Sequence, residues 1–189
     1  MQQDDFGKKF ENFLHAFGAA RLLLKRAHDS GFLIEGIILY ASIIDGLLRN
    51  ALILKSQLGS KGSVIDEALI SQEGRSRYTE KMIYSLALNK RIIDQELHSE
   101  LMHLYGMRNG IVHRFFLTGI EYAHLPEVLI RYEHLYNILF RIVYALEAEQ
   151  VKRGVGMTVS KNITIEDKEM IHKKVMSKID SSKPTISDL

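Results

Sequence analysis

The sequence predicts an all-α protein, a bundle of five to seven helices with an extended C-terminal helical arm. Only two prolines occur, Pro126 and Pro184, so most of the chain lacks the residue that breaks helices most strongly. Apolar residues recur at helical spacing through most of the chain, and no stretch keeps the two-residue alternation of a strand. We expect residues 1–153 to form the bundle and residues 154–189 to provide a linker, a short helix and a tail.

The first two helices are expected over residues 5–27 and 32–54. The first has an apolar face, and Gly31 is suited to end it. Its face is formed by Phe6, Phe10, Phe13, Leu14, Phe17 and Leu24. The second is apolar on nearly all sides, so we expect it to be the buried centre of the bundle. Its polar exceptions form a stripe along one side, namely Glu35, Ser42, Asp45 and Arg49.

The remaining helices are shorter or more polar, apart from the long apolar helix over residues 126–152. They are expected over residues 64–71, from residue 78 onward, and over residues 94–113, 126–152 and 164–179. The helix over 126–152 has a proline in its first turn and a long apolar face, so it can pack in the bundle and also serve a dimer. The last helix has few apolar residues and a capped start at Thr164 and Asp167, and we expect it to be an arm that packs on another surface.

Composition restricts the class of protein further. A length of 189 residues suits one domain, and a hydrophobic content of 46% can build the full core of a soluble protein. Charged residues interrupt the apolar stretches, so no membrane span is expected. The acidic N-terminus does not resemble a signal peptide. The chain has no cysteine, which excludes disulfides and thiolate metal sites. We therefore expect a cytoplasmic protein.

The clearest chemical signal lies at the end of the helix over 94–113, in Arg108, Asn109 and His113. Arginine presents a planar fork of donors suited to phosphate, and histidine exchanges a proton near neutral pH. Asn109 and His113 are four residues apart, so the amide is expected to orient the imidazole. Arg108 and His113 point about 140° apart on an ideal helix. A long Arg108 side chain, or a helix loosened at Gly110, would bring them to one substrate. The alternative is a helix end with a surface arginine and a polar pair.

This stretch resembles the HEPN family, named for higher eukaryotic and prokaryotic nucleotide-binding domains. Its ribonuclease members carry an arginine, a polar residue, a few variable positions and a histidine at the end of a helix in a small bundle. The resemblance runs from about Tyr78 to Phe116, and the apolar helix over 32–54 stands where the family has one. The residues that carry it are Tyr78 to Ile83, Ile92 to Asp94, Leu97, Leu101, Leu104, Arg108, Asn109, Val112 and His113. It implies a dimer with a composite site, and settings such as toxin–antitoxin pairs or phage defence.

The leading hypothesis is a metal-independent endoribonuclease, for which no metal or cofactor is expected. The 2′-hydroxyl of RNA is a built-in nucleophile, so the enzyme must move protons and neutralise the phosphate. His113 would act as base or acid, Arg108 as the phosphate clamp and Asn109 as the orienting group. One chain supplies one such histidine, and a homodimer would supply both. The alternative is a non-catalytic helical module of the same fold, which binds a nucleotide or RNA or acts in assembly.

Contacts with RNA would depend on a local basic patch, because the net charge is only +2. The candidate residues for this patch are Arg75, Arg77 and Arg114, and the alternative is an ordinary solvated loop.

Asp45 is a candidate partner that would support Arg108 or His113, and the alternative is a pair with Arg49 inside its own helix. The HEPN resemblance further implies that an antitoxin or another regulatory protein would restrain the nuclease.

Overall fold

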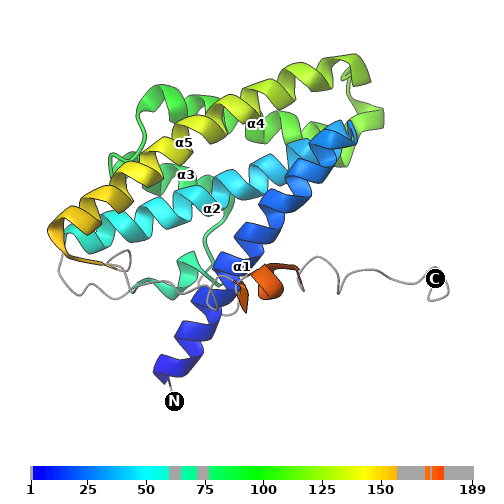
Figure 1. The fold of residues 1–189 in the computed structure, drawn as a ribbon. Helices are drawn as coiled ribbons and strands as arrows, with labels where there is room; N and C mark the ends of the chain where they lie inside the picture. The colour runs from blue at the N-terminus through cyan, green and yellow to red at the C-terminus, as the bar shows by residue number, and fades with distance from the viewer. Residues whose placement is uncertain (1, 60–64, 72–76, 157–168, 171, 177–189) are drawn as a thin grey trace.

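The computed structural model describes residues 2–59, 65–71, 77–156, 169–170 and 172–176 (Figure 1). These residues contain helices and no strand, which confirms the all-α class. The α-helices are α1 (Gln2–Asp29), α2 (Leu33–Gly59), α3 (Glu80–Asn89), α4 (Gln95–Arg114) and α5 (Leu125–Arg153). Three 3₁₀ helices cover Glu67–Leu69, Phe115–Leu117 and Tyr122–His124. The short helix expected over 64–71 is thus a single 3₁₀ turn in its described part. Most of the helix expected over 164–179, and the tail after it, lie outside the described residues.

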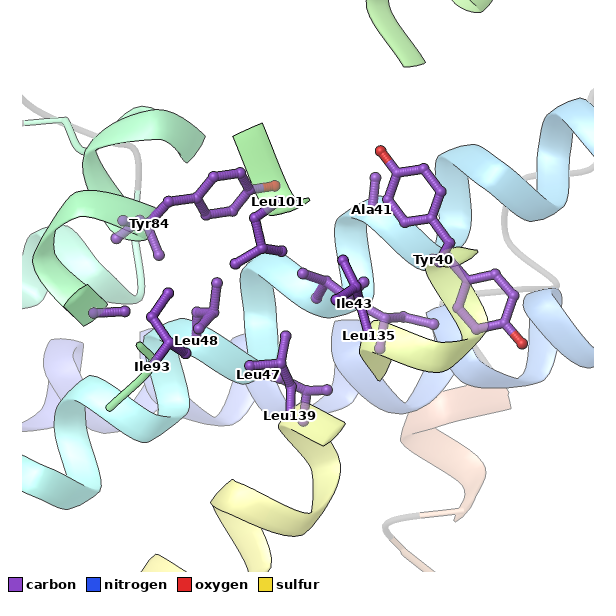
Figure 2. Close-up of a cluster of buried hydrophobic side chains, with 14 of the residues drawn as sticks. Tyr40, Ala41, Ile43, Leu47, Leu48, Tyr84, Ile93, Leu101, Leu135 and Leu139 are labelled. Carbon is purple, nitrogen blue, oxygen red and sulfur yellow. The ribbon is translucent and has the colours of Figure 1, made fainter. Parts of the chain in front are cut away.

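Helix α2 is the centre of the fold, as its composition predicts. It packs along α5 and also contacts α1, α3 and α4 (Figure 1). Figure 2 shows its inward side chains meeting residues of α3, α4 and α5, among them Tyr84, Leu101 and Leu135. By length and composition alone α2 is apolar enough to cross a membrane, but 72% of that apolar stretch is buried inside the fold. Its apolar surface is therefore accounted for by its central position.

Helix α1 crosses α2 at a glycine, and a C-terminal segment packs on α1. A β-carbon at Gly46 would lie 2.9 Å from the ring of Phe17, so the absence of a side chain allows the two helices to approach closely. Residues 169–170 and 172–176 are helical. Val175 contacts α1 at Gly18, and Lys174 forms an ion pair with Glu11. The described part of the expected arm therefore folds back onto α1.

Two helices end at a glycine with positive φ. The φ angle is +69° at Gly31 after α1 and +60° at Gly154 after α5. In each case the glycine and the residue after it donate backbone N–H groups to carbonyls of the last turn, which satisfies groups that the helix end would leave unpaired. The role predicted for Gly31 is confirmed.

Helix α3 ends in the same way, but with Arg91 where the other two helices have glycine. The φ angle of Arg91 is +53°. Its N–H donates to the carbonyl of Leu88, and the N–H of Ile92 donates to the carbonyl of Ala87, both at 2.9 Å. A residue with a β-carbon is strained in this left-handed conformation. The hydrogen bonds that close α3 and lead into α4 therefore hold a strained residue.

We expect Arg91→Gly to stabilise the protein. Relief of the left-handed strain is worth about 1 kcal/mol, partly offset by the greater freedom of glycine in the unfolded chain. The melting temperature should rise by about 1–2 °C. Gly31→Ala makes the opposite change, because it introduces a β-carbon at a left-handed position, and it should lower the melting temperature by a similar amount. Thermal denaturation followed by circular dichroism measures both, and a lower melting temperature for Arg91→Gly would refute the strain.

Candidate functional site

The residues of the predicted motif lie in the last two turns of α4. The helix is capped by Asp94, whose carboxylate accepts a hydrogen bond from the backbone N–H of Leu97 at 2.8 Å. It then runs without interruption through Gly110 to Arg114. A regular helix separates residues 108 and 113 by about 140°. The loosening at Gly110 that would bring the two side chains together is not present in this structure.

Arg108 is held on several sides. Its Nη1 donates to Oε2 of Glu80 at 2.6 Å, and the two side chains are only 19% and 16% exposed. Its Nη2 and Nε both donate to Oδ1 of Asn109, at 2.9 and 3.3 Å. The guanidinium also lies over the ring of Tyr105, 4.8 Å from the centroid. These bonds use three of the five N–H donors of Arg108, so two donors have no partner among the described residues.

Glu80 is fixed by its own helix and by a buried tyrosine. It is the first residue of α3, directly after Thr79, whose hydroxyl caps the helix. Its other oxygen, Oε1, accepts a hydrogen bond from the hydroxyl of the buried Tyr84. Burial acts to lower the pKa of Arg108, but the hydrogen bond and charge of Glu80 outweigh it, so that pKa is raised. Glu80 therefore stabilises the charged guanidinium.

Asn109 and His113 do not form the pair that their spacing predicts. The Asn109 oxygen is bonded to Arg108, its neighbour in the chain. The imidazole of His113 is exposed and makes no hydrogen bond or ion pair with any described residue. In this structure Asn109 therefore orients the arginine, and His113 is open to solvent.

Asp45 pairs with Arg49 inside α2, which is the alternative that the sequence left open. The Nε of Arg49 donates to Asp45 at 2.6 Å, and Arg49 is only 5% exposed. Its Nη1 donates to the carbonyls of Ala68 and Leu69 at 3.3 and 3.2 Å, and its Nη2 donates to the carbonyl of Tyr78 at 3.0 Å. Arg49 thus ties the 3₁₀ turn at Ala68 and Leu69, and the backbone of Tyr78 just before α3, to the central helix.

Asp45 also acts on the motif through its charge. Burial is the largest effect on the pKa of Asp45 and leaves it raised, although the bond with Arg49 acts to lower it. The nearby charge of Glu80 also raises this pKa, and that of Arg108 lowers it. Two carboxylates and two guanidinium groups therefore lie within electrostatic reach of one another, and their formal charges sum to zero. Any anion that binds Arg108 must depend on its remaining donors and on further cations nearby.

One such cation is Lys81, which the sequence did not single out. Its exposed ammonium lies 4.8 Å from the centroid of the Tyr105 ring, the same ring that Arg108 contacts. Arg114 is exposed at the end of α4, and Arg77 is exposed just before α3. Arg75 lies outside the described residues. The structure thus gathers Lys81 and Arg108 around one aromatic ring.

The residues that sequence reasoning missed are Glu80, Lys81 and Tyr105. Tyr105 carried a usable signal, because it lies three residues before Arg108 and so shares its helix face. Glu80 and Lys81 belong to a different helix, 28 and 24 residues from their partners. A single sequence has no local pattern that links residues so far apart.

Comparison with known proteins adds no relative: no family model matches the chain, and no curated protein or solved structure is similar to it. Within the described ranges, no group of three or more His, Asp or Glu side chains is placed to hold a metal ion. The motif residues and their contacts therefore carry the functional argument.

We expect Arg49→Met to destabilise the fold strongly. It leaves Asp45 without its partner and removes the donor from three backbone carbonyls, and breaking a buried pair in this way costs about 3–5 kcal/mol. Arg153→Met is the matched control, because Arg153 makes the same intrahelical pair with Glu149 but on the surface, where such pairs contribute about 1 kcal/mol or less. Urea unfolding measures both. Equal losses for the two variants would contradict the role assigned to Arg49.

Proposed function

We propose that this chain is a metal-independent endoribonuclease of the HEPN type that acts in the cytoplasm. The observation that carries the proposal is the fixed guanidinium of Arg108, which retains two donors, on the same helix as the solvent-open His113. Lys81 supports it as a further cation that contacts the same Tyr105 ring as Arg108. A toxin–antitoxin or phage-defence role, with an antitoxin or other regulatory protein as partner, belongs to the same proposal.

The chemistry needs no bound metal. His113 accepts the proton of the 2′-hydroxyl, and the 2′-oxygen attacks the adjacent phosphorus. The bond from phosphorus to the 5′-oxygen then breaks, and a second imidazole returns a proton to that oxygen. The products are a 2′,3′-cyclic phosphate and a free 5′-hydroxyl. The two remaining donors of Arg108 bind the phosphate oxygens and stabilise the charge that develops on them.

A homodimer would supply the second imidazole. Within one chain Arg108 and His113 diverge by about 140° on a continuous helix, which favours a site completed by a second copy. Exposed apolar side chains lie close to His113 in the chain: Val112, Leu117 and Tyr122. Exposed apolar surface of this kind is typical of interaction sites. We therefore propose that this end of the bundle contacts its counterpart in a second chain.

The second candidate is a non-catalytic helical module that binds a nucleotide or RNA or acts in assembly. The observation that favours it is the ion pair between Arg108 and Glu80, which joins α4 to α3 and balances the charge of the arginine. On this hypothesis Arg108 stabilises the bundle, and His113 is an ordinary surface residue. The effect of removing His113 separates the two candidates.

We expect the purified protein to cleave single-stranded RNA in EDTA and to leave 2′,3′-cyclic phosphate ends. His113→Ala should lower the rate by about 10²–10⁴. Arg108→Lys keeps the charge but loses the planar fork, so it should also fail substantially. Asn109→Ala should be milder, because it removes one restraint on Arg108. His103→Ala, an exposed histidine on the same helix, is the control and should cleave normally. Full cleavage by His113→Ala, or a requirement for a divalent ion, would favour the non-catalytic module.

The dimer makes a separate prediction that compares two exposed apolar residues. Leu117, 85% exposed, follows the motif, whereas Tyr144, 66% exposed, lies on α5. Helices α4 and α5 run antiparallel, with the first turns of α4 beside residues 134–138. Tyr144 is thus separated from His113 by roughly the 30 Å length of α4. Leu117→Glu should give a monomer without cleavage, and Tyr144→Glu should change neither property. Size-exclusion chromatography with light scattering measures assembly. A wild-type monomer at micromolar concentration would exclude the composite site.

A further inference from the structure

The carboxylate of Glu80 makes a different bond with each of its oxygens. Oε2 receives Nη1 of Arg108 at 2.6 Å, and Oε1 receives the hydroxyl of Tyr84. Tyr84 is buried in the core, beside residues of α2 and α4 (Figure 2). The carboxylate therefore cannot turn without losing one of the two bonds. A fixed chain of contacts runs from the core through Tyr84 and Glu80 to the guanidinium.

The restraints on Arg108 use three of its five N–H donors and leave two without a partner among the described residues. Glu80 takes one donor of Nη1, Asn109 takes Nε and one donor of Nη2, and Tyr105 supports one face of the plane. A free arginine side chain carries about 2 kcal/mol of rotamer entropy. A guanidinium that is already ordered does not lose that freedom when substrate binds, and it meets the phosphate in one orientation.

From this arrangement we infer that Glu80 is a positioning residue, which orients the two remaining donors of Arg108 toward the phosphate of an RNA substrate. The inference rests on the proposed function, since the phosphate belongs to that reaction. A competing role exists for the same ion pair: Glu80 would act as an internal anion that blocks Arg108. The two roles predict opposite effects when the carboxylate is neutralised. If Glu80 blocks Arg108, substrate should bind more tightly; if Glu80 positions Arg108, kcat should fall.

Glu80→Gln is the variant that separates these roles. The glutamine keeps the size of the side chain and one oxygen that can accept from Tyr84. Its amide nitrogen would face Nη1 of Arg108, so two donors would meet and the ion pair would be lost. The matched control is Glu100→Gln. Glu100 lies on α4, the helix that carries the motif, and forms an ion pair with Arg131 of α5 at 2.8 Å. Glu100 makes no contact with Arg108.

The first measurement is steady-state cleavage of a short synthetic RNA in EDTA, with the melting temperature of each variant recorded. Glu80→Gln should lower kcat by about tenfold to a hundredfold, the loss expected when a binding group is misplaced by a short distance. Its melting temperature should fall further than that of Glu100→Gln, because Glu80 and Arg108 are more buried than Glu100 and Arg131, so kcat is measured well below both unfolding transitions. Glu100→Gln should keep kcat within about twofold of wild type. An unchanged kcat for Glu80→Gln would overturn the positioning role. So would tighter binding of a 2′-O-methyl RNA, which cannot be cleaved, if the turnover of the cleavable RNA is undiminished.

The second measurement does not require cleavage. The side-chain Nε–H signal of Arg108 can be followed in ¹H–¹⁵N spectra and assigned by its loss in Arg108→Lys. It should be sharp and slow to exchange in the wild type and in Glu100→Gln, and broadened or lost in Glu80→Gln. If the wild type cleaves no RNA, the proposed function fails, and this signal alone decides whether Glu80 orders Arg108. A sharp, slowly exchanging signal in Glu80→Gln would overturn the inference in either case.

Discussion

The buried guanidinium of Arg49 is the contact on which the rest of the site depends. It is anchored by Asp45 within the central helix and bonds to backbone carbonyls on both sides of the segment that leads into α3. One of these carbonyls belongs to Tyr78, two residues before Glu80, which is the first residue of α3. The orientation of Arg108 is thus set by two consecutive arginine–carboxylate pairs, of which the first is inside the core.

On the proposed function, these pairs explain how a chain with little net charge would present a phosphate-binding arginine to RNA. Arg108 is charged and rigid because Glu80 and Asn109 hold it, and its charge is largely balanced locally. Specific binding would then come from the direction of the free donors and from Lys81 on the shared Tyr105 ring, and less from long-range attraction. Such a site would discriminate by geometry, since a mobile lysine cannot present two parallel donors.

Helical periodicity was sufficient to predict the fold class, the central position of α2 and the extent of α4, because burial and helix geometry act on neighbouring residues. The site was predicted only in part. Asn109 had two partners within reach, His113 one turn away and Arg108 beside it, and spacing rules consider only the first. Glu80 was invisible as a partner because its contact joins two helices. The left-handed Arg91 carried no signal either, since glycine is the residue that normally marks such a position.

The Glu80–Arg108 pair has a consequence for how this fold can change over evolutionary time. Each charge is mostly buried, and a buried charge without its partner is strongly destabilising. A substitution at either position alone is therefore selected against through folding, even where cleavage is dispensable. On the proposed function, relatives that lose the reaction should replace both residues together, with an apolar pair of similar volume. Joint replacement of positions 80 and 108 across two helices would then mark the lineages in which this bundle has become a purely structural module.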